Sequence, residues 1–244
     1  MKVQQENIER FKLFYNSDFY NTLLQEYQQK LNNDKKAMNY VNEVFEYLSV
    51  DPDSCDFELY KLLGEKHKLL PRKYYLEDEV DGQTIRLSAD IVCGRKQIVN
   101  YHDGEFEKWI LDYELIRSNL SLHFLWPKHK APTINTYRYT KYLDRIDCLL
   151  YDIKEYFSGK ETPMIPAYQQ EITAKWLCKF KNDFPYFINS LQLNAFVDSE
   201  YNVLDISKGQ NQILNRIYSR PELVKTMNDY MKNLLELNSK GKFQ

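Results

Sequence analysis

The sequence predicts a single α+β domain that is mainly α-helical and has a small antiparallel sheet, or hairpin, in its middle. Apolar residues recur at helical spacing over both ends of the chain. Around Asp81-Gly82 the period changes to two, and this dipeptide is a strong signal for a tight hairpin turn. Only 7 Gly and 8 Pro occur among the 244 residues, which favours long helices over a turn-rich all-β fold.

The N-terminal region, residues 1–50, predicts an antiparallel pair of helices. Ser17 is placed to cap the first helix, and a polar linker at 32–34 leads into the second. The apolar faces of this pair consist of Tyr20, Leu23, Leu24, Tyr27 and Leu31, and of Met38, Val41, Val44, Phe45 and Leu48. A third, short helix is expected after the DPDS run that starts at Asp51, and it should end before Pro71.

Residues 51–130 are expected to mix strands and helices. Strands at Tyr74–Leu76 and Thr84–Leu87 flank the Asp81-Gly82 turn, and the second of them alternates apolar and polar residues like a half-buried strand. Further candidate elements, in chain order, are a strand at Ile98–Tyr101, a helix at Glu105–Arg117 and a strand at Leu120–Trp126.

Residues 131–244 predict a helical half. One long helix is expected from about Ile134 to Phe157, where Ser158-Gly159 provides a stop. Further elements are helices at 166–180 and 185–193, a small hairpin around Ser199-Glu200, and a last helix that begins with the capping box Ser219-Arg-Pro-Glu222. No linker divides the chain, so residues 1–244 are expected to form one domain.

Charge and cysteine usage narrow the class of protein. The net charge of −2 provides no general attraction to nucleic acid or to an anionic membrane, although a local patch could bind either. No apolar run approaches the ~20 residues that span a bilayer, and the first ten residues lack the apolar core of a signal peptide. The four cysteines form no CxxC pair. We therefore expect a cytoplasmic protein with free thiols, no metal, no cofactor and no membrane contact.

Common catalytic motifs do not occur in the chain. It contains no GxGxxG and no GxxxxGK[ST] run, which argues against nucleotide binding by a strand–loop–helix. It also contains no HExxH and no GxSxG, which argues against the usual metalloprotease and esterase classes.

The densest polar constellation lies on the predicted central helix and comprises Asn135, Arg138, Asp144, Arg145 and Asp147. Polar groups among core-directed apolar residues need partners. Asp144 and Asp147 stand three apart and would share a helix face, so they could bind a metal or pair with arginines. Two interpretations stay open. One is a buried ion-pair network that fixes the helix against the sheet, which we favour, and the other is a binding site.

A Trp-Pro step and a basic loop precede this helix. Trp126 begins the segment, and Lys128, His129 and Lys130 follow it. Three converging donors could contact an anion, which makes Trp126, Lys128 and His129 candidate binding residues. A solvated basic loop is the simpler interpretation and the one we favour.

Arg117 and His123, in the run RSNLSLH, resemble the Arg and His of the helical ribonucleases called HEPN domains. In such enzymes the Arg would stabilise the phosphate charge and the His would move a proton. The pattern consists of two residues, and the partly strand-like character of Leu120–Trp126 argues against the helical geometry that it needs.

Further runs occur together: DPDS, LYKLLGEKHKLLP up to Pro71, LSAD at Leu87–Asp90, FLWPK at Phe124–Lys128, TINTYR and LDRIDCLL. In this order and spacing, over residues 51–187, the chain resembles an uncharacterised bacterial family common in low-GC genomes and their mobile elements. It departs from the family pattern at Tyr139, where Gly is usual, and it lacks a Trp before the first Leu-Pro. The resemblance implies a phage- or mobile-element-related origin and no particular mechanism.

Two functions follow from these observations. The first is a non-enzymatic binding or effector protein of a phage- or defence-related locus, which acts by protein–protein interaction with Tyr and Arg as anchors. The second is a nucleic-acid-processing enzyme centred on Arg117 and His123 or on the helix of Asp144 and Asp147. A basic cleft at either constellation would favour the enzyme, and an exposed aromatic patch distant from both would favour the binder. The sequence leaves the oligomeric state open.

Overall fold

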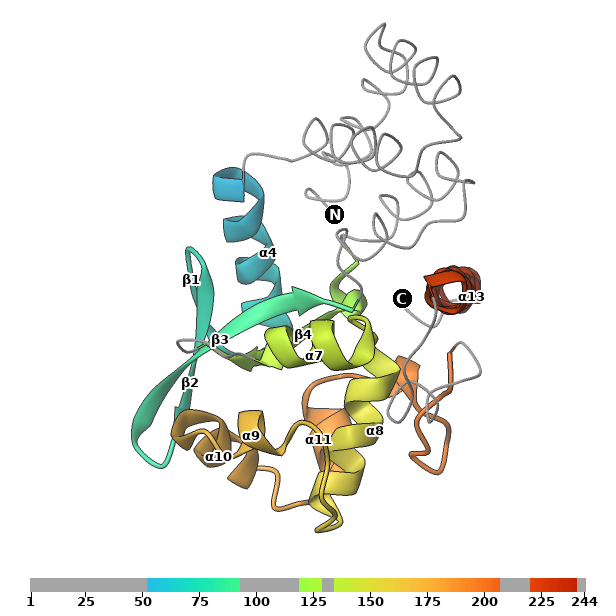
Figure 1. Ribbon diagram of the computed structural model, residues 1–244. Coiled ribbons are helices and arrows are strands. Elements are labelled where there is room, and N and C mark those ends of the chain that lie inside the picture. Colours follow the sequence, from blue (N-terminus) through green and yellow to red (C-terminus); the bar gives the residue numbers. More distant parts are fainter. Residues whose placement is uncertain (1–51, 93–118, 129–133, 207–219, 241–244) are drawn as a thin grey trace, which may run out of the picture.

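The computed structural model describes residues 52–92, 119–128, 134–206 and 220–240. Within them, helices pack against a four-stranded antiparallel sheet with the strand order β1-β2-β3-β4 (Figure 1). The predicted class, α+β with a small sheet among helices, is confirmed. Three predicted parts lie outside the described residues and stay predictions: the helices of 1–50, the strand at Ile98–Tyr101 and the helix at Glu105–Arg117.

One helix precedes the sheet. Helix α4 (Pro52–His67) begins with a proline, which suits a first turn, and it places Tyr60 and Leu63 in the core. As predicted, it ends before Pro71. The strands are β1 (Leu70–Arg72), β2 (Tyr75–Val80), β3 (Gln83–Ile91) and β4 (His123–Pro127).

The β2–β3 hairpin turns at Asp81 and Gly82, as predicted. The φ angles are +50° at Asp81 and +74° at Gly82, so both residues adopt the left-handed region that a type I′ turn requires. Val80 pairs with Gln83 next to the turn. Alternation then leaves one face of the hairpin to solvent and buries the other, which carries Leu76, Val80, Ile85 and Leu87.

The remaining helices follow the sheet. They are α7 (Ile134–Tyr142), α8 (Ile146–Phe157), α9 (Ile165–Tyr168), α10 (Glu171–Cys178), α11 (Phe184–Ser190) and α13 (Arg220–Ser239). Short 3-10 helices occupy Leu120–Leu122 and Asn194–Phe196. The predicted hairpin around Ser199-Glu200 is reduced to one antiparallel bridge between Val197 and Val203. The predicted helix over 166–180 is divided into α9 and α10.

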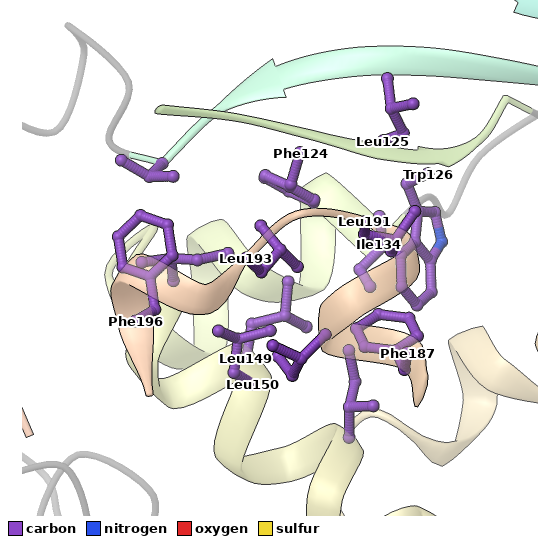
Figure 2. Packing of buried hydrophobic residues seen from close by; sticks show 14 of the residues in the cluster. Phe124, Leu125, Trp126, Ile134, Leu149, Leu150, Phe187, Leu191, Leu193 and Phe196 are labelled. Atoms are coloured by element: carbon purple, nitrogen blue, oxygen red, sulfur yellow. The ribbon is translucent and has the colours of Figure 1, made fainter. Parts of the chain in front are cut away.

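The core lies between β4 and the helices that follow it. Figure 2 shows Phe124 and Trp126 of β4 directed toward the side chains of α8 and α11 and of the segment after α11. Trp126 is 1% exposed, and its ring centroid lies 5.3 Å from that of Trp176 and 6.0 Å from that of Tyr168. Edge-to-face aromatic packing of this kind stabilises a core beyond its buried area. The structure therefore places Trp126 in the core.

The prediction of one helix from Ile134 to Phe157 was wrong, because the chain breaks between α7 and α8. Leu143 and Asp144 have φ angles of +51° and +64°, and the Asp144 amide donates to the Arg138 carbonyl at 3.1 Å. A left-handed conformation costs a non-glycine residue roughly 1–2 kcal/mol. Neither Gly nor Pro marks the break. Interactions elsewhere must therefore offset the strain, and those interactions define the site.

Candidate functional site

Arg138 on α7 is the centre of a first network. Its side chain is 0% exposed, and its Nη2 donates to Oδ2 of Asp90 at 2.8 Å and to the Ile91 carbonyl at 2.9 Å. The same nitrogen lies 2.6 Å from Oδ1 of Asp144. The guanidinium also stands over the ring of Phe124, 4.7 Å from its centroid. One buried cation is thus shared by two carboxylates, one from the sheet and one from the break.

The break between α7 and α8 makes this network possible. Residues six apart on a regular helix point roughly 120° away from one another, because each residue turns the helix by about 100°. A continuous helix would therefore hold the Asp144 carboxylate away from Arg138. The left-handed turn at Leu143 and Asp144 brings the two together, and their ion pair in turn offsets the backbone strain.

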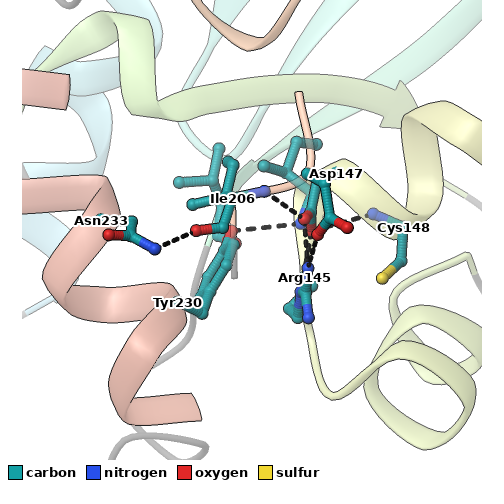
Figure 3. Close-up of polar contacts among 9 residues, drawn as sticks. Arg145, Asp147, Cys148, Ile206, Tyr230 and Asn233 are labelled. Atoms are coloured by element: carbon teal, nitrogen blue, oxygen red, sulfur yellow. Dashed lines mark hydrogen bonds and ion pairs between the residues drawn. The ribbon is translucent and has the colours of Figure 1, made fainter. Parts of the chain in front are cut away.

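Arg145, the N-cap residue of α8, is the centre of a second network (Figure 3). Its side chain and that of Asp147 are both 0% exposed. Nε of Arg145 donates to Oδ1 of Asp147 at 2.9 Å, and its Nη2 pairs with Oδ2 of the same carboxylate. Asp205 adds a second carboxylate at 3.5 Å. Bidentate pairing of a guanidinium with a carboxylate is strong and directional.

Asp147 also ties two backbone segments together. Its Oδ1 accepts from the Cys148 amide and its Oδ2 accepts from the Ile206 amide, both at 3.0 Å. The carboxylate lies in the first turn of α8, where the helix dipole favours a negative charge. Both oxygens of this buried carboxylate are therefore occupied, and Oδ2 joins the start of α8 to the segment that ends at Ile206.

Tyr230 connects the C-terminal helix to the same region. Its hydroxyl donates to the Val92 carbonyl at 3.0 Å and accepts from the Ile146 amide at 3.2 Å. Its ring lies beneath the Arg145 guanidinium, 5.2 Å away. Asn233, one turn later on α13, donates to the Ile206 carbonyl (Figure 3). The network thus joins the end of β3, the start of α8 and α13.

The expectation that Asp144 and Asp147 share a helix face was wrong. Asp144 lies in the break and pairs with Arg138, whereas Asp147 lies in α8 and pairs with Arg145. The two carboxylates therefore belong to different networks. Among the described residues, no group of three or more His, Cys, Asp or Glu side chains is arranged to hold a metal ion.

The sequence did not lead us to a third buried polar cluster. Asp152 on α8 is 2% exposed and accepts hydrogen bonds from the hydroxyls of Tyr168, at 2.6 Å, and of Tyr142. Burial raises the pKa of Asp152, and the tyrosine hydrogen bonds oppose that rise. A signal was present, since Asp152 adjoins Ile153 within the apolar stripe of the helix.

The other candidate residues do not join these networks within the described structure. His123 is the first residue of β4, is 7% exposed and has Nδ1 3.0 Å from the Asn119 carbonyl oxygen. Arg117 and His129 lie outside the described residues, as does the side chain of Asn135. His123 therefore stands on a strand, and the helical pairing expected for a HEPN site has no counterpart at this residue.

Lys128 takes a surface position just after β4. Its amide donates to the Arg86 carbonyl at 2.7 Å, which extends the pairing with β3 by one residue. Its Nζ lies 5.9 Å from the centroid of the Tyr75 ring. The predicted basic loop therefore begins at the solvent-facing side of the sheet.

Two titratable groups at these sites are perturbed by burial. Burial raises the pKa of Asp90 against the lowering effect of Arg138, and the nearby charge of Asp144 raises it further. Burial also raises the pKa of the Cys148 thiol well above its usual range. A thiol held in its neutral form is a poor nucleophile, so the chemistry of the site is that of paired charges.

His67, at the end of α4, predicts a pH dependence of stability. Burial and the charge of Lys66 lower its pKa from 6.5 to about 4. The unfolded chain therefore binds more protons than the folded chain between these values, and stability should fall as the pH drops from about 7 to 4. We expect the loss from His67 to reach about 2 kcal/mol, allowing for partial solvent exposure.

Urea unfolding of wild type and His67→Asn at several pH values measures this contribution. The difference between the two proteins should change across the window from pH 7 to 4. A difference that is independent of pH would contradict the lowered pKa of His67.

Comparisons with known proteins identify one family. A family described as "Family of unknown function (DUF6994)" matches residues 49–240. No curated protein and no solved structure matches the chain. All the networks described above lie within the matched residues. None of the described helices combines the length and apolar character needed to cross a membrane.

Proposed function

The chain belongs to DUF6994, a family of unknown function, and on that premise we propose that it is a non-enzymatic protein that binds a protein partner. The observation that carries the proposal is that the buried charges of the polar networks pair within the chain. Arg138 and Arg145 are both 0% exposed, and each faces two carboxylates of the same chain. Groups that are committed to one another in this way hold the fold and do not meet a substrate.

Side chains suited to partner binding remain at the surface. Leu70 is 51% exposed, Tyr186 is 48% exposed and Tyr74 is 37% exposed. Large apolar and tyrosine side chains are effective anchors in protein–protein interfaces, where they enter pockets of the partner. None of the three takes part in the hydrogen bonds and ion pairs described above for the buried networks, which is what a binding protein with a structural interior would show.

The setting of this function is proposed on two grounds. The resemblance to a family of low-GC bacteria and their mobile elements supports a phage- or defence-related locus. Cys148 and Cys178 are free thiols, which supports a reducing cytoplasm.

Thiol reactivity provides a prediction for the cysteines. In the native protein Cys178 is exposed and should react rapidly, whereas buried Cys148, with its raised pKa, should be protected. Under denaturing, non-reducing conditions, titration should find four thiols, and two or fewer would contradict the proposal of unpaired cysteines. A Cys178→Ser variant should lose the rapid phase of thiol modification in the native protein, which assigns that phase to Cys178.

The nucleic-acid-processing alternative is weaker. Asp144 and Asp147 are each neutralised by a different arginine, and His123 lies on a strand. This alternative would need the buried carboxylates to open, at the cost of uncompensated buried charges.

Capture from a lysate of cells that express the protein separates the two functions. The immobilised wild-type chain should retain a protein that survives nuclease treatment, and the purified chain should leave RNA and DNA oligonucleotides intact. Hydrolysis of an oligonucleotide that is lost in His123→Ala, with an unchanged melting temperature, would overturn the proposal in favour of the enzyme.

A further inference from the structure

One face of the sheet is exposed to solvent over β1, β2 and the hairpin part of β3, and it carries a group of cations. Strand register places Arg72 opposite Tyr75 and Glu77 opposite Arg86, so these four side chains lie on one face. The opposite face carries the buried residues of the hairpin. In Figure 1, β1, β2 and β3 form the left side of the molecule, with β1 at the edge.

Tyr75 is the centre of this face. The Arg86 guanidinium lies 4.9 Å from the centroid of its ring, and Nζ of Lys128 lies 5.9 Å from the same centroid. A tyrosine ring attracts cations through its quadrupole and so restrains two flexible basic side chains at one place on the sheet. Both cations are exposed. The ring therefore orders part of a binding site before any partner arrives.

The carboxylates of the face are already occupied. Glu77 accepts from Nε of Arg72 at 2.9 Å, and Glu79 accepts from the Thr84 hydroxyl at 2.5 Å. Within the described residues, neither Arg86 nor Lys128 has a carboxylate within ion-pair distance. The positive charge of these two side chains is thus available to an anion from outside.

From this juxtaposition we propose that Arg86 and Lys128, held on Tyr75, bind a carboxylate side chain of an acidic segment of the partner protein. This inference rests on the proposed function and adds the surface and the chemistry of the partner. A guanidinium and an ammonium that both lie against one ring can each donate a charge-assisted hydrogen bond to a carboxylate. Leu70, 51% exposed and on the same face, provides an apolar contact for a neighbouring residue of that segment.

The mixed charge of the face favours a protein over a nucleic acid. Glu77 and Glu79 stand in the same row as Tyr75 along β2. A polyanion that runs along the sheet would meet these two carboxylates at close range, whereas a protein segment presents its carboxylate at one point. Nucleic-acid sites on sheets also use aromatic rings as stacking platforms, and here cations lie against the Tyr75 ring.

The edge of the sheet is protected from strand addition. β1 has only three residues and contains Pro71, which has no amide hydrogen to donate. A partner is therefore expected to contact side chains on the face and not to extend the sheet.

The test compares capture by three full-length proteins. The first is wild type, the second carries Arg86→Glu and Lys128→Glu, and the third carries Lys181→Glu and Lys225→Glu, a matched reversal of two exposed lysines elsewhere. All three should share one melting temperature. Binding by the sheet-face variant should be roughly tenfold weaker or more, with the control variant near wild type. An Arg86→Gln, Lys128→Gln variant should show a smaller loss.

Carbodiimide cross-linking identifies the chemical group that is bound. This reagent joins a lysine amine to a carboxylate in direct contact, so Nζ of Lys128 should form an amide with an Asp or Glu of the captured protein. Equal capture by all three proteins would show that Arg86 and Lys128 are not the binding surface, and it would leave the proposed function intact. Failure of wild type to capture any protein would overturn both. Capture abolished by nuclease would show that the face binds nucleic acid and would overturn the acidic protein partner.

Discussion

Asp147→Ala should lower the free energy of unfolding by about 2–5 kcal/mol, because it removes the main partner of a buried cation. In the variant, the carboxylate that Arg145 keeps among the described residues is Asp205, at 3.5 Å and 43% exposed, while the Arg145 side chain is itself 0% exposed. The amides of Cys148 and Ile206 also lose their acceptor. Each buried donor that is left without an acceptor adds a desolvation cost.

Thermal and urea unfolding measure this loss directly. For a chain of this size the melting temperature should fall by roughly 4–20 °C. Glu171→Ala is the matched control, because Glu171 is 79% exposed and pairs with Lys175 at the surface. Its removal should change stability by no more than about 0.5 kcal/mol. A melting curve of Asp147→Ala that overlays wild type, together with loss of partner binding, would show that the network is a functional site.

Local patterns were sufficient to predict the hairpin. Asp81-Gly82 accepts left-handed backbone angles on both residues, and the alternation in β3 orients its faces without reference to the rest of the chain. The end of α4 before Pro71 likewise depends on neighbouring residues only. These features depend on residues within a few positions of one another, so a sequence reveals them.

The break between α7 and α8 could not be predicted in this way. Leu143 is not a turn residue by type, Asp144 alone is a weak turn signal, and the segment has a helical pattern on both sides. The break depends on Arg138, whose other carboxylate, Asp90, lies 48 residues away on β3. A contact of such separation leaves no periodic signal. Sequence reasoning found the polar residues of the cluster but assigned the wrong partners to the two aspartates.

Arg138→Ala should cause a loss of similar size and should also change the pH dependence of stability. The substitution leaves two carboxylates, Asp90 and Asp144, near each other without their shared cation. Breaking a buried ion pair from one side costs about 3–5 kcal/mol. The ion pair that offsets the left-handed turn is lost as well, so the start of α8 should become less stable than the rest of the helix.

The direction of the pH effect follows from the pKa of Asp90. Burial and Asp144 already raise this pKa, whereas Arg138 and the hydrogen bond from the Ile91 amide lower it. Without the arginine, the folded-state pKa should rise further above the unfolded value of 3.8. The folded variant then binds more protons than its unfolded chain, so its stability relative to wild type should increase as the pH falls from 7 toward 4. Urea unfolding of both proteins at pH 7 and pH 5 measures this recovery. A stability difference between the variant and wild type that is the same at pH 7 and pH 5 would mean that the carboxylates do not depend on Arg138 for their charge.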